Sequence, residues 1–161
     1  MSTPDAAPGV QVLAPCAGRV VPMSDVPDPV FASEMVGPGV AIQPSLPATG
    51  GRTTVRSPIA GKVVKVHPHA FVVLGAGGAG VLVHLGIDTN RLEGKGFEVL
   101  ATQGSTVQAG DAMVTWDPTE VAAGGLSAIV PVVLMDAPKG SVTSPLEGSQ
   151  ASPGDVLFTV G

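Results

Sequence analysis

Short apolar runs separated by glycine and proline recur along the whole chain, and this pattern predicts strands. Strand side chains alternate between the two faces of a sheet, so His84 would share a face with Leu82 and Gly86. The runs return at intervals of roughly ten residues, which is typical of sandwiches and barrels. We therefore predict an all-β fold, an antiparallel β-sandwich or barrel.

A second histidine precedes the neighbouring apolar run. A glycine-rich stretch separates the two runs and predicts a hairpin. A four-residue loop at 75–78 would make His69 and His84 direct cross-strand partners, with Cβ atoms about 4.5–5.5 Å apart. A six-residue loop at 75–80 would offset them diagonally on the same face, and an odd-length loop would break this pairing.

Two imidazoles on an otherwise apolar face form a compact site for a phosphoryl group. One neutral ring nitrogen can act as a nucleophile, while the other ring donates a hydrogen bond to a phosphoryl oxygen. A structural role is the more common one for a single histidine. The pairing of the two favours a functional role here.

A repeated unit and one helix signal complete the architecture. An apolar-Pro-x-x-Gly-x-Val pattern occurs at 14–20 and 57–63, and faintly at 144–148, which predicts internal duplication. Asp, Pro and Glu at 117–120 are typical of a helix start, and the glycines at 124–125 end it, so the helix is very short. We predict one domain at 10–161 behind a disordered tail at 1–9.

Composition narrows the functional class. Only 13% of the 161 residues are charged and the net charge is −5, which excludes a nucleic-acid footprint and leaves room for an apolar docking patch. The lone Cys16 cannot form an internal disulfide and is predicted to be a small buried hydrophobe. No secretory segment or run of roughly 18 apolar residues is present, so we expect a cytoplasmic protein without membrane insertion.

The amino-acid sequences of several segments resemble those of a known family. They run colinearly over most of the chain, at 25–32, 36–42, 57–63, 69–71, 83–89, 92–97 and 104–111. Together they resemble the glucose-class enzyme IIA of the bacterial phosphoenolpyruvate-dependent sugar phosphotransferase system. The resemblance implies a duplicated β-sandwich similar to a duplicated hybrid motif, and a phosphotransferase component that carries a phosphohistidine.

The resemblance also assigns roles to residues. His84 would accept the phosphoryl group and His69 would orient and neutralise it, helped by backbone N–H groups near Gly86. Asp28 and Asp88 would form an acidic rim that meets an arginine of the carrier protein HPr. The expected apolar contact ring consists of Pro29, Val30, Phe31, Val36, Val40 and Leu82. No cofactor beyond the covalent phosphoryl group on His84 is implied, and no metal.

The implied partners are HPr and the IIB domain of a membrane-embedded IIBC transporter for glucose- or N-acetylglucosamine-type sugars. Regulatory targets occur in some lineages, and the choice of sugar belongs to the IIB and IIC partners. The chain departs from many relatives at His67, where threonine is common, and from some at Leu82, where phenylalanine occurs. The first departure affects the surroundings of the predicted site.

Two alternatives stay open on residues alone. The repeated unit and residues 104–111 resemble half-motifs of biotinyl or lipoyl carrier domains, but the methionine-containing segment 33–36 offers no lysine. A metal-dependent hydrolase using His67, His69 and His84 is the other, because a His-x-His pair places two imidazoles on one face. Pro68 disturbs that strand, and no nearby carboxylate is placed as a general base.

Overall fold

The structure is a computed structural model that describes residues 11–44, 51–75, 78–135, 137, 141–144 and 146–160. The predicted tail at 1–9 lies outside the described residues. The strands, in chain order, are β1 (Gln11–Leu13), β2 (Gly18–Pro22), β3 (Gly39–Pro44), β4 (Thr53–Arg56), β5 (Gly61–His67), β6 (Ala70–Leu74), β7 (Gly80–His84), β8 (Phe97–Val99), β9 (Thr106–Val107), β10 (Ala112–Trp116), β11 (Val130–Leu134), β12 (Val142–Thr143), β13 (Gln150–Ala151) and β14 (Val156–Val160).

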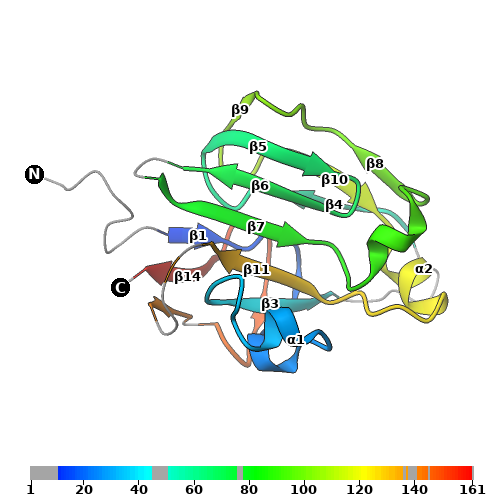
Figure 1. Cartoon of the computed structure of the whole chain (residues 1–161), viewed down its shortest axis with the longest axis horizontal. Coiled ribbons are helices and arrows are strands. Elements are labelled where there is room, and N and C mark those ends of the chain that lie inside the picture. The colour runs from blue at the N-terminus through cyan, green and yellow to red at the C-terminus, as the bar shows by residue number, and fades with distance from the viewer. Residues whose placement is uncertain are drawn as a thin grey trace, which may run out of the picture.

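The strands form one large and two small sheets (Figure 1). The large sheet has the order β13-β2-β3-β11-β7-β6-β5-β9, and the small sheets have the orders β1-β14-β12 and β4-β10-β8. Every pairing among the described strands is antiparallel. The predicted antiparallel β-sandwich is therefore confirmed.

Helical structure is confined to short segments. These are α1 (Pro29–Ala32), α2 (Pro118–Ala123) and the 3₁₀ turns η1 (Met23–Asp25) and η3 (Thr89–Leu92). The predicted helix start is confirmed, because the Asp117 carboxylate accepts the N–H of Glu120 and Gly124 caps the other end. Within the described ranges no helix is long and apolar enough to cross a membrane.

Equivalent hydrogen bonds confirm the internal duplication. The Leu13 N–H donates to the Pro58 carbonyl and the Arg56 N–H donates to the Pro15 carbonyl, each with an N···O distance of 2.9 Å. These two bonds exchange when each residue is replaced by its counterpart in the other copy. The copies beginning at β1 and at β4 are thus joined by reciprocal hydrogen bonds and are related by an approximate two-fold axis.

The closing turns of the two copies repeat as well. The Asp111 carboxylate accepts the N–H of Gln108, and the Asp155 carboxylate accepts the N–H of Ser152. The Ser57 N–H donates to the carbonyl of the first aspartate, as the Ala14 N–H does to that of the second, both at 2.8 Å. The same local chemistry therefore fixes both ends of the sandwich.

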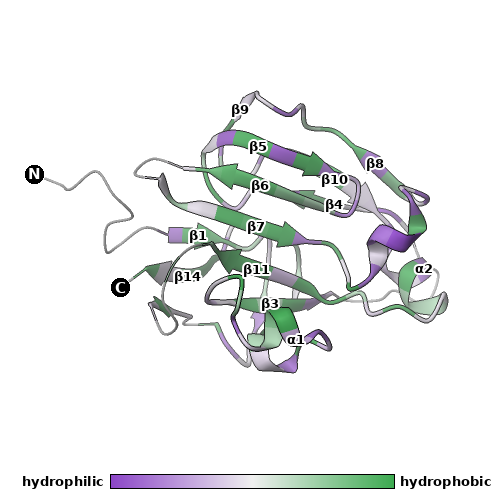
Figure 2. Cartoon of the chain, viewed as in Figure 1, coloured by the Kyte–Doolittle hydropathy of each residue, from purple (hydrophilic) through white to green (hydrophobic). Residues whose placement is uncertain are grey.

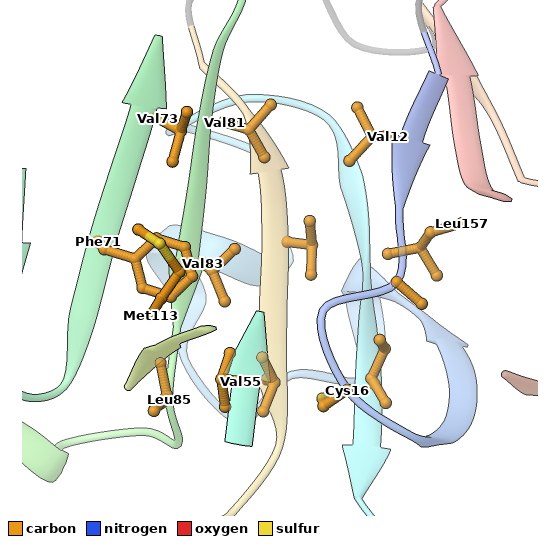
Figure 3. Packing of buried hydrophobic residues seen from close by; sticks show 14 of the residues in the cluster. Val12, Cys16, Val55, Phe71, Val73, Val81, Val83, Leu85, Met113 and Leu157 are labelled. Carbon is orange, nitrogen blue, oxygen red and sulfur yellow. The ribbon is translucent and has the colours of Figure 1, made fainter. Parts of the chain in front are cut away.

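One face of the large sheet builds the main core (Figure 3). Phe71, Val83 and Met113 are fully buried there, and Figure 3 shows their side chains gathered between the sheets. Cys16 belongs to the same core, as predicted, and burial raises the pKa of its thiol to about 12. A thiol with so high a pKa stays protonated and behaves as a small hydrophobe.

A smaller apolar cluster covers the opposite face of the sheet. It contains Met23, Val26, Phe31, Ala41, Ile87, Ile129 and Val133. Figure 2 shows that β6, β7 and β11 are largely apolar and that α1 carries apolar residues beside the sheet. The segment from β2 to β3, which contains η1 and α1, supplies this cover. The predicted site lies at the border of the small cluster.

Candidate active site

The three histidines come together at one end of the large sheet. His67 ends β5, His84 ends β7, and His69 lies in the turn immediately before β6. Figure 1 shows the ends of β5 and β7 and the start of β6 side by side. The sheet order β7-β6-β5 therefore gathers residues from three neighbouring strands.

The histidines meet by a route different from the one that the sequence predicts. Leu74 pairs with Gly80, so the connection has an odd number of residues and His84 faces Ala70, not His69. This is the odd-length case, in which neither the direct nor the diagonal pairing of His69 and His84 forms. His69 still reaches His84 because it lies in a turn, where the strict alternation of strand side chains does not apply.

Ring contacts link the site residues. The centroids of His69 and His84 are 5.3 Å apart with an interplanar angle of 71°, an edge-on contact. His67 stacks on the other ring of the pair, His69, at 5.7 Å and 21°. The ring centroids of Phe31 and His84 are 5.2 Å apart, with an interplanar angle of 58°. His84 therefore has an apolar ring on one side and an imidazole on another.

A hydrogen bond fixes the tautomer of His84. Its Nδ1 lies 2.5 Å from the carbonyl oxygen of Gly86. A carbonyl oxygen can only accept, so Nδ1 carries the proton and the lone pair of the neutral ring lies on Nε2. Gly86 has φ 79°, and a side chain there would come within 2.6 Å of Thr89 and 2.8 Å of the Ser127 carbonyl. Only glycine permits this turn of the backbone.

The environment keeps both rings of the central pair neutral near pH 7. Burial lowers the pKa of His84 from its usual 6.5, and this effect exceeds the opposing influence of the Gly86 carbonyl, Asp28 and Asp88. Burial also lowers the pKa of His69, and the charges of His84 and His67 lower it further. A neutral His84 is the form that can attack phosphorus.

The expected backbone donors are occupied. The N–H groups of Leu85, Gly86 and Ile87 donate to the carbonyls of His69, Ile129 and Ser127 at 2.7, 3.0 and 2.9 Å. These three N–H groups hold the strand end in place, so they are not available as donors to the phosphoryl group. Gly86 contributes its carbonyl instead, and no sequence pattern distinguishes these two uses of a glycine.

The predicted rim residues occupy different environments. Asp28 caps α1, where its carboxylate accepts the N–H groups of Val30 at 2.9 Å and Phe31 at 3.4 Å. Asp88 is exposed and precedes η3 with φ 62°. Both carboxylates lie near enough to His84 to raise its proton affinity. The two predicted acidic residues thus flank the site.

The apolar contact ring is only partly as predicted. Val30 is 44% exposed, while Leu82 and Val36 are half-buried. Phe31 is 9% exposed and Val40 only 2%. Val40 belongs to the main core and is wrongly placed in the ring, because its position on β3 points it inward. Phe31 serves the site chiefly through the ring of His84.

Comparisons with known proteins identify the family and the fold. Residues 10–149 match the family described as phosphoenolpyruvate-dependent sugar phosphotransferase system, EIIA 1. The glucose-specific EIIA component of Oceanobacillus iheyensis is 38% identical over 127 residues, which are 78% of this chain and 73% of that protein. Glucose permease IIA from Mycoplasma capricolum has a solved structure with 33% identity and a TM-score of 0.82, covering 96% of this chain and 97% of the other.

Longer relatives contain a similar stretch. The glucose-specific EIIBCA component of Corynebacterium glutamicum is 38% identical over 144 residues, or 88% of this chain, and the mannose-specific EIIBCA component is 36% identical over 153 residues, or 94%. The matched part is 20% and 22% of those proteins. This chain thus spans about a fifth of each.

The fold and these relatives define a phosphotransferase component built on a duplicated β-sandwich. The chain belongs to the EIIA type 1 family of the phosphoenolpyruvate-dependent sugar phosphotransferase system. This membership does not favour the biotinyl or lipoyl carrier and metal-dependent hydrolase alternatives.

Proposed function

We propose that His84 accepts a phosphoryl group on Nε2 from the phosphohistidine of HPr and passes it to the cysteine of a IIB domain. The observation that carries this proposal is the bond between His84 Nδ1 and the Gly86 carbonyl, which leaves the lone pair on Nε2. A half-buried, neutral imidazole with one fixed tautomer is a nucleophile held ready for attack.

The first transfer balances without an added reagent. The Nε2 lone pair forms a bond to phosphorus while the nitrogen–phosphorus bond of the donor breaks, and that electron pair returns to the donor imidazole. His84 then carries a positive charge that its Nδ1–H shares with the Gly86 carbonyl. The carboxylates of Asp28 and Asp88 stabilise this charge, in keeping with their effect on the proton affinity of His84.

The second transfer reverses the roles. A cysteine thiolate of IIB forms a sulfur–phosphorus bond, and the electron pair of the breaking nitrogen–phosphorus bond returns to Nε2. Negative charge is spread over the equatorial oxygens in such loose transition states, so positioned hydrogen-bond donors matter more than covalent chemistry. We propose His69 as the hydrogen-bond donor to these oxygens, because its ring lies edge-on to His84.

The surroundings of His84 suit a basic partner with an apolar centre. Val30 and Leu82 offer accessible apolar surface beside Asp28 and Asp88, which can pair with an arginine of HPr. We propose that IIB docks on the same surface, that the transporter takes a glucose- or N-acetylglucosamine-type sugar, and that the protein works in the cytoplasm, where phosphoenolpyruvate is made.

The test uses the full chain with HPr, enzyme I and phosphoenolpyruvate labelled with ³²P. We expect one acid-labile label per chain, mapped to His84, and transfer of that label to a IIB domain. His84→Gln should take up none, because no other ring presents a nitrogen at that position. Label on His69 or His67, or phosphate delivered to IIB by the His84→Gln variant, would refute the assignment.

A further inference from the structure

The third imidazole of the site has no part in the transfer described above. His67 is exposed at the end of β5 and stacks almost parallel on the ring of His69. Two rings at 5.7 Å and 21° are in the range in which aromatic pairs attract one another. This contact links the exposed edge of the site to His69, the proposed hydrogen-bond donor to the phosphoryl group.

We propose that His67 is a positioning residue, which holds the His69 ring edge-on to His84 through the stacking contact. This inference rests on the proposed function, because it takes His69 as the group that meets the transferring phosphoryl oxygens.

The local structure shows why His69 needs such support. It lies in a two-residue turn with Pro68, outside the strand ladder that fixes its neighbours. Its backbone carbonyl is held by the Leu85 N–H at 2.7 Å. Among the described residues, however, none hydrogen-bonds to its ring, which contacts the rings of His84 and His67. The stack therefore restricts the rotation of a half-buried side chain.

The stacked His67 also affects the protonation of His69. The charges of His67 on β5 and His84 on β7 lower the pKa of His69, whereas Asp28 at the start of α1 and Asp88 before η3 act on His84 and oppose the lowering of its pKa. A proton on His67 opposes a proton on His69, because two stacked cations repel. His67 thus favours the neutral form of His69 until a phosphoryl group arrives with its negative charge.

Two substitutions separate the stack from the charge. His67→Phe keeps an aromatic ring that can stack but cannot take a proton, whereas His67→Ala removes both. Lys65→Ala changes an exposed residue two positions earlier on β5 and serves as the matched control. All are compared with wild type at pH 8, where an ordinary histidine is neutral.

The rate of phosphoryl transfer from His84 to IIB is measured by single-turnover kinetics, and the titration of His69 by NMR of the unphosphorylated protein. We expect His67→Ala to slow transfer about threefold to tenfold, the range that one aromatic pair provides. His67→Phe and Lys65→Ala should stay within about twofold of wild type. The titration midpoint of His69 should rise in both His67 variants and not in Lys65→Ala.

The outcomes discriminate between the two proposals. Wild-type rates in His67→Ala, or equal slowing in His67→Ala and His67→Phe, would overturn the stacking role. Failure of wild type to carry label on His84 would instead overturn the proposed function, and mapping the label tests this separately. Far-UV circular dichroism checks that each variant is folded.

Discussion

The two halves of the sandwich share a scaffold but differ in what they add to it. In the first half, residues 23–38 connect β2 to β3 and include η1 and α1. In the second half, only the turn of Pro68 and His69 connects β5 to β6. The long connection supplies an apolar cover with Phe31, and the short one supplies an imidazole. Both contribute a ring that contacts the ring of His84.

The central strands show the same divergence. Val81 on β7 and Val130 on β11 occupy matched ladder positions, and counting along each strand makes Val133 the counterpart of His84. Val133 is fully buried in the small cluster, whereas His84 stands at its border. The duplicated hydrogen bonds hold the sheet, and the site occurs where the copies stop being alike.

The largest effect should come from His69→Gln, which changes the residue that only the second half contributes to the site. The amide keeps a donor but loses the ring that lies edge-on to His84, so loading from HPr should continue while transfer to IIB slows. Loss of one positioned donor costs about 2.7–4 kcal/mol of transition-state stabilisation, or roughly one hundredfold to one thousandfold in rate. Single-turnover transfer of ³²P to IIB measures this. An unchanged rate would remove His69 from the transfer step.

Equivalent core positions in the two copies should contribute equally to stability, although the two copies contribute differently to the site. Val20 and Val63 are counterparts in the two copies, and both are fully buried in the main core. Truncation to alanine removes two buried methyl groups and leaves a cavity, so each variant should lose about 2 kcal/mol in the free energy of unfolding. Urea denaturation measures both.

The two losses should agree within about 1 kcal/mol, which is less than the spread of about 2 kcal/mol for one substitution at unrelated core sites. A much larger loss at one position would show that the copies share hydrogen bonds but not packing.

Local patterns are enough to predict much of this scaffold. Strand runs, the repeated proline and glycine unit and the Asp117-Pro118 helix start depend on neighbours in the chain, and each was confirmed. The register of β6 and β7 was not, because it depends on the length of a glycine-rich loop whose turn residues favour no single geometry. One residue more or less in that loop changes the partner of His84.

Some features of the site could likewise be predicted from the sequence, and others could not. His84 and His69 could be chosen from pattern and resemblance, and the structure brings their rings together. The Gly86 carbonyl, the burial of Val40 and the stacked His67 could not, because each depends on segments that meet only in the folded sheet. A sequence states which side chains are present, and packing decides which of their atoms are available.

The lowered histidine pKa values should make stability depend on pH. His84 and His69 take up protons less readily in the folded protein than at the ordinary value of 6.5 that applies when it is unfolded. Their contribution is complete above that value and is lost as the pH falls from 6.5 through the lowered folded values. Thermal unfolding between pH 8 and 5 should therefore show declining stability.

Replacement of His84 isolates its share of this effect. His84→Gln should show a shallower decline over the same pH range, while Lys65→Ala should follow wild type. Parallel curves for wild type and His84→Gln would mean that burial of His84 does not shift its titration.

The smallest effect compares two helix starts with the same local sequence. Asp28-Pro29 and Asp117-Pro118 each begin a short helix with an aspartate cap, but only Asp28 raises the proton affinity of His84. Asparagine caps a helix about as well as aspartate, so Asp28→Asn should change stability by only a few tenths of a kcal/mol. It should nevertheless lower the titration midpoint of His84, because a stabilising negative charge is gone. NMR titration of the His84 ring should show no such shift in Asp117→Asn, and equal midpoints in both variants would separate Asp28 from the electrostatics of the site.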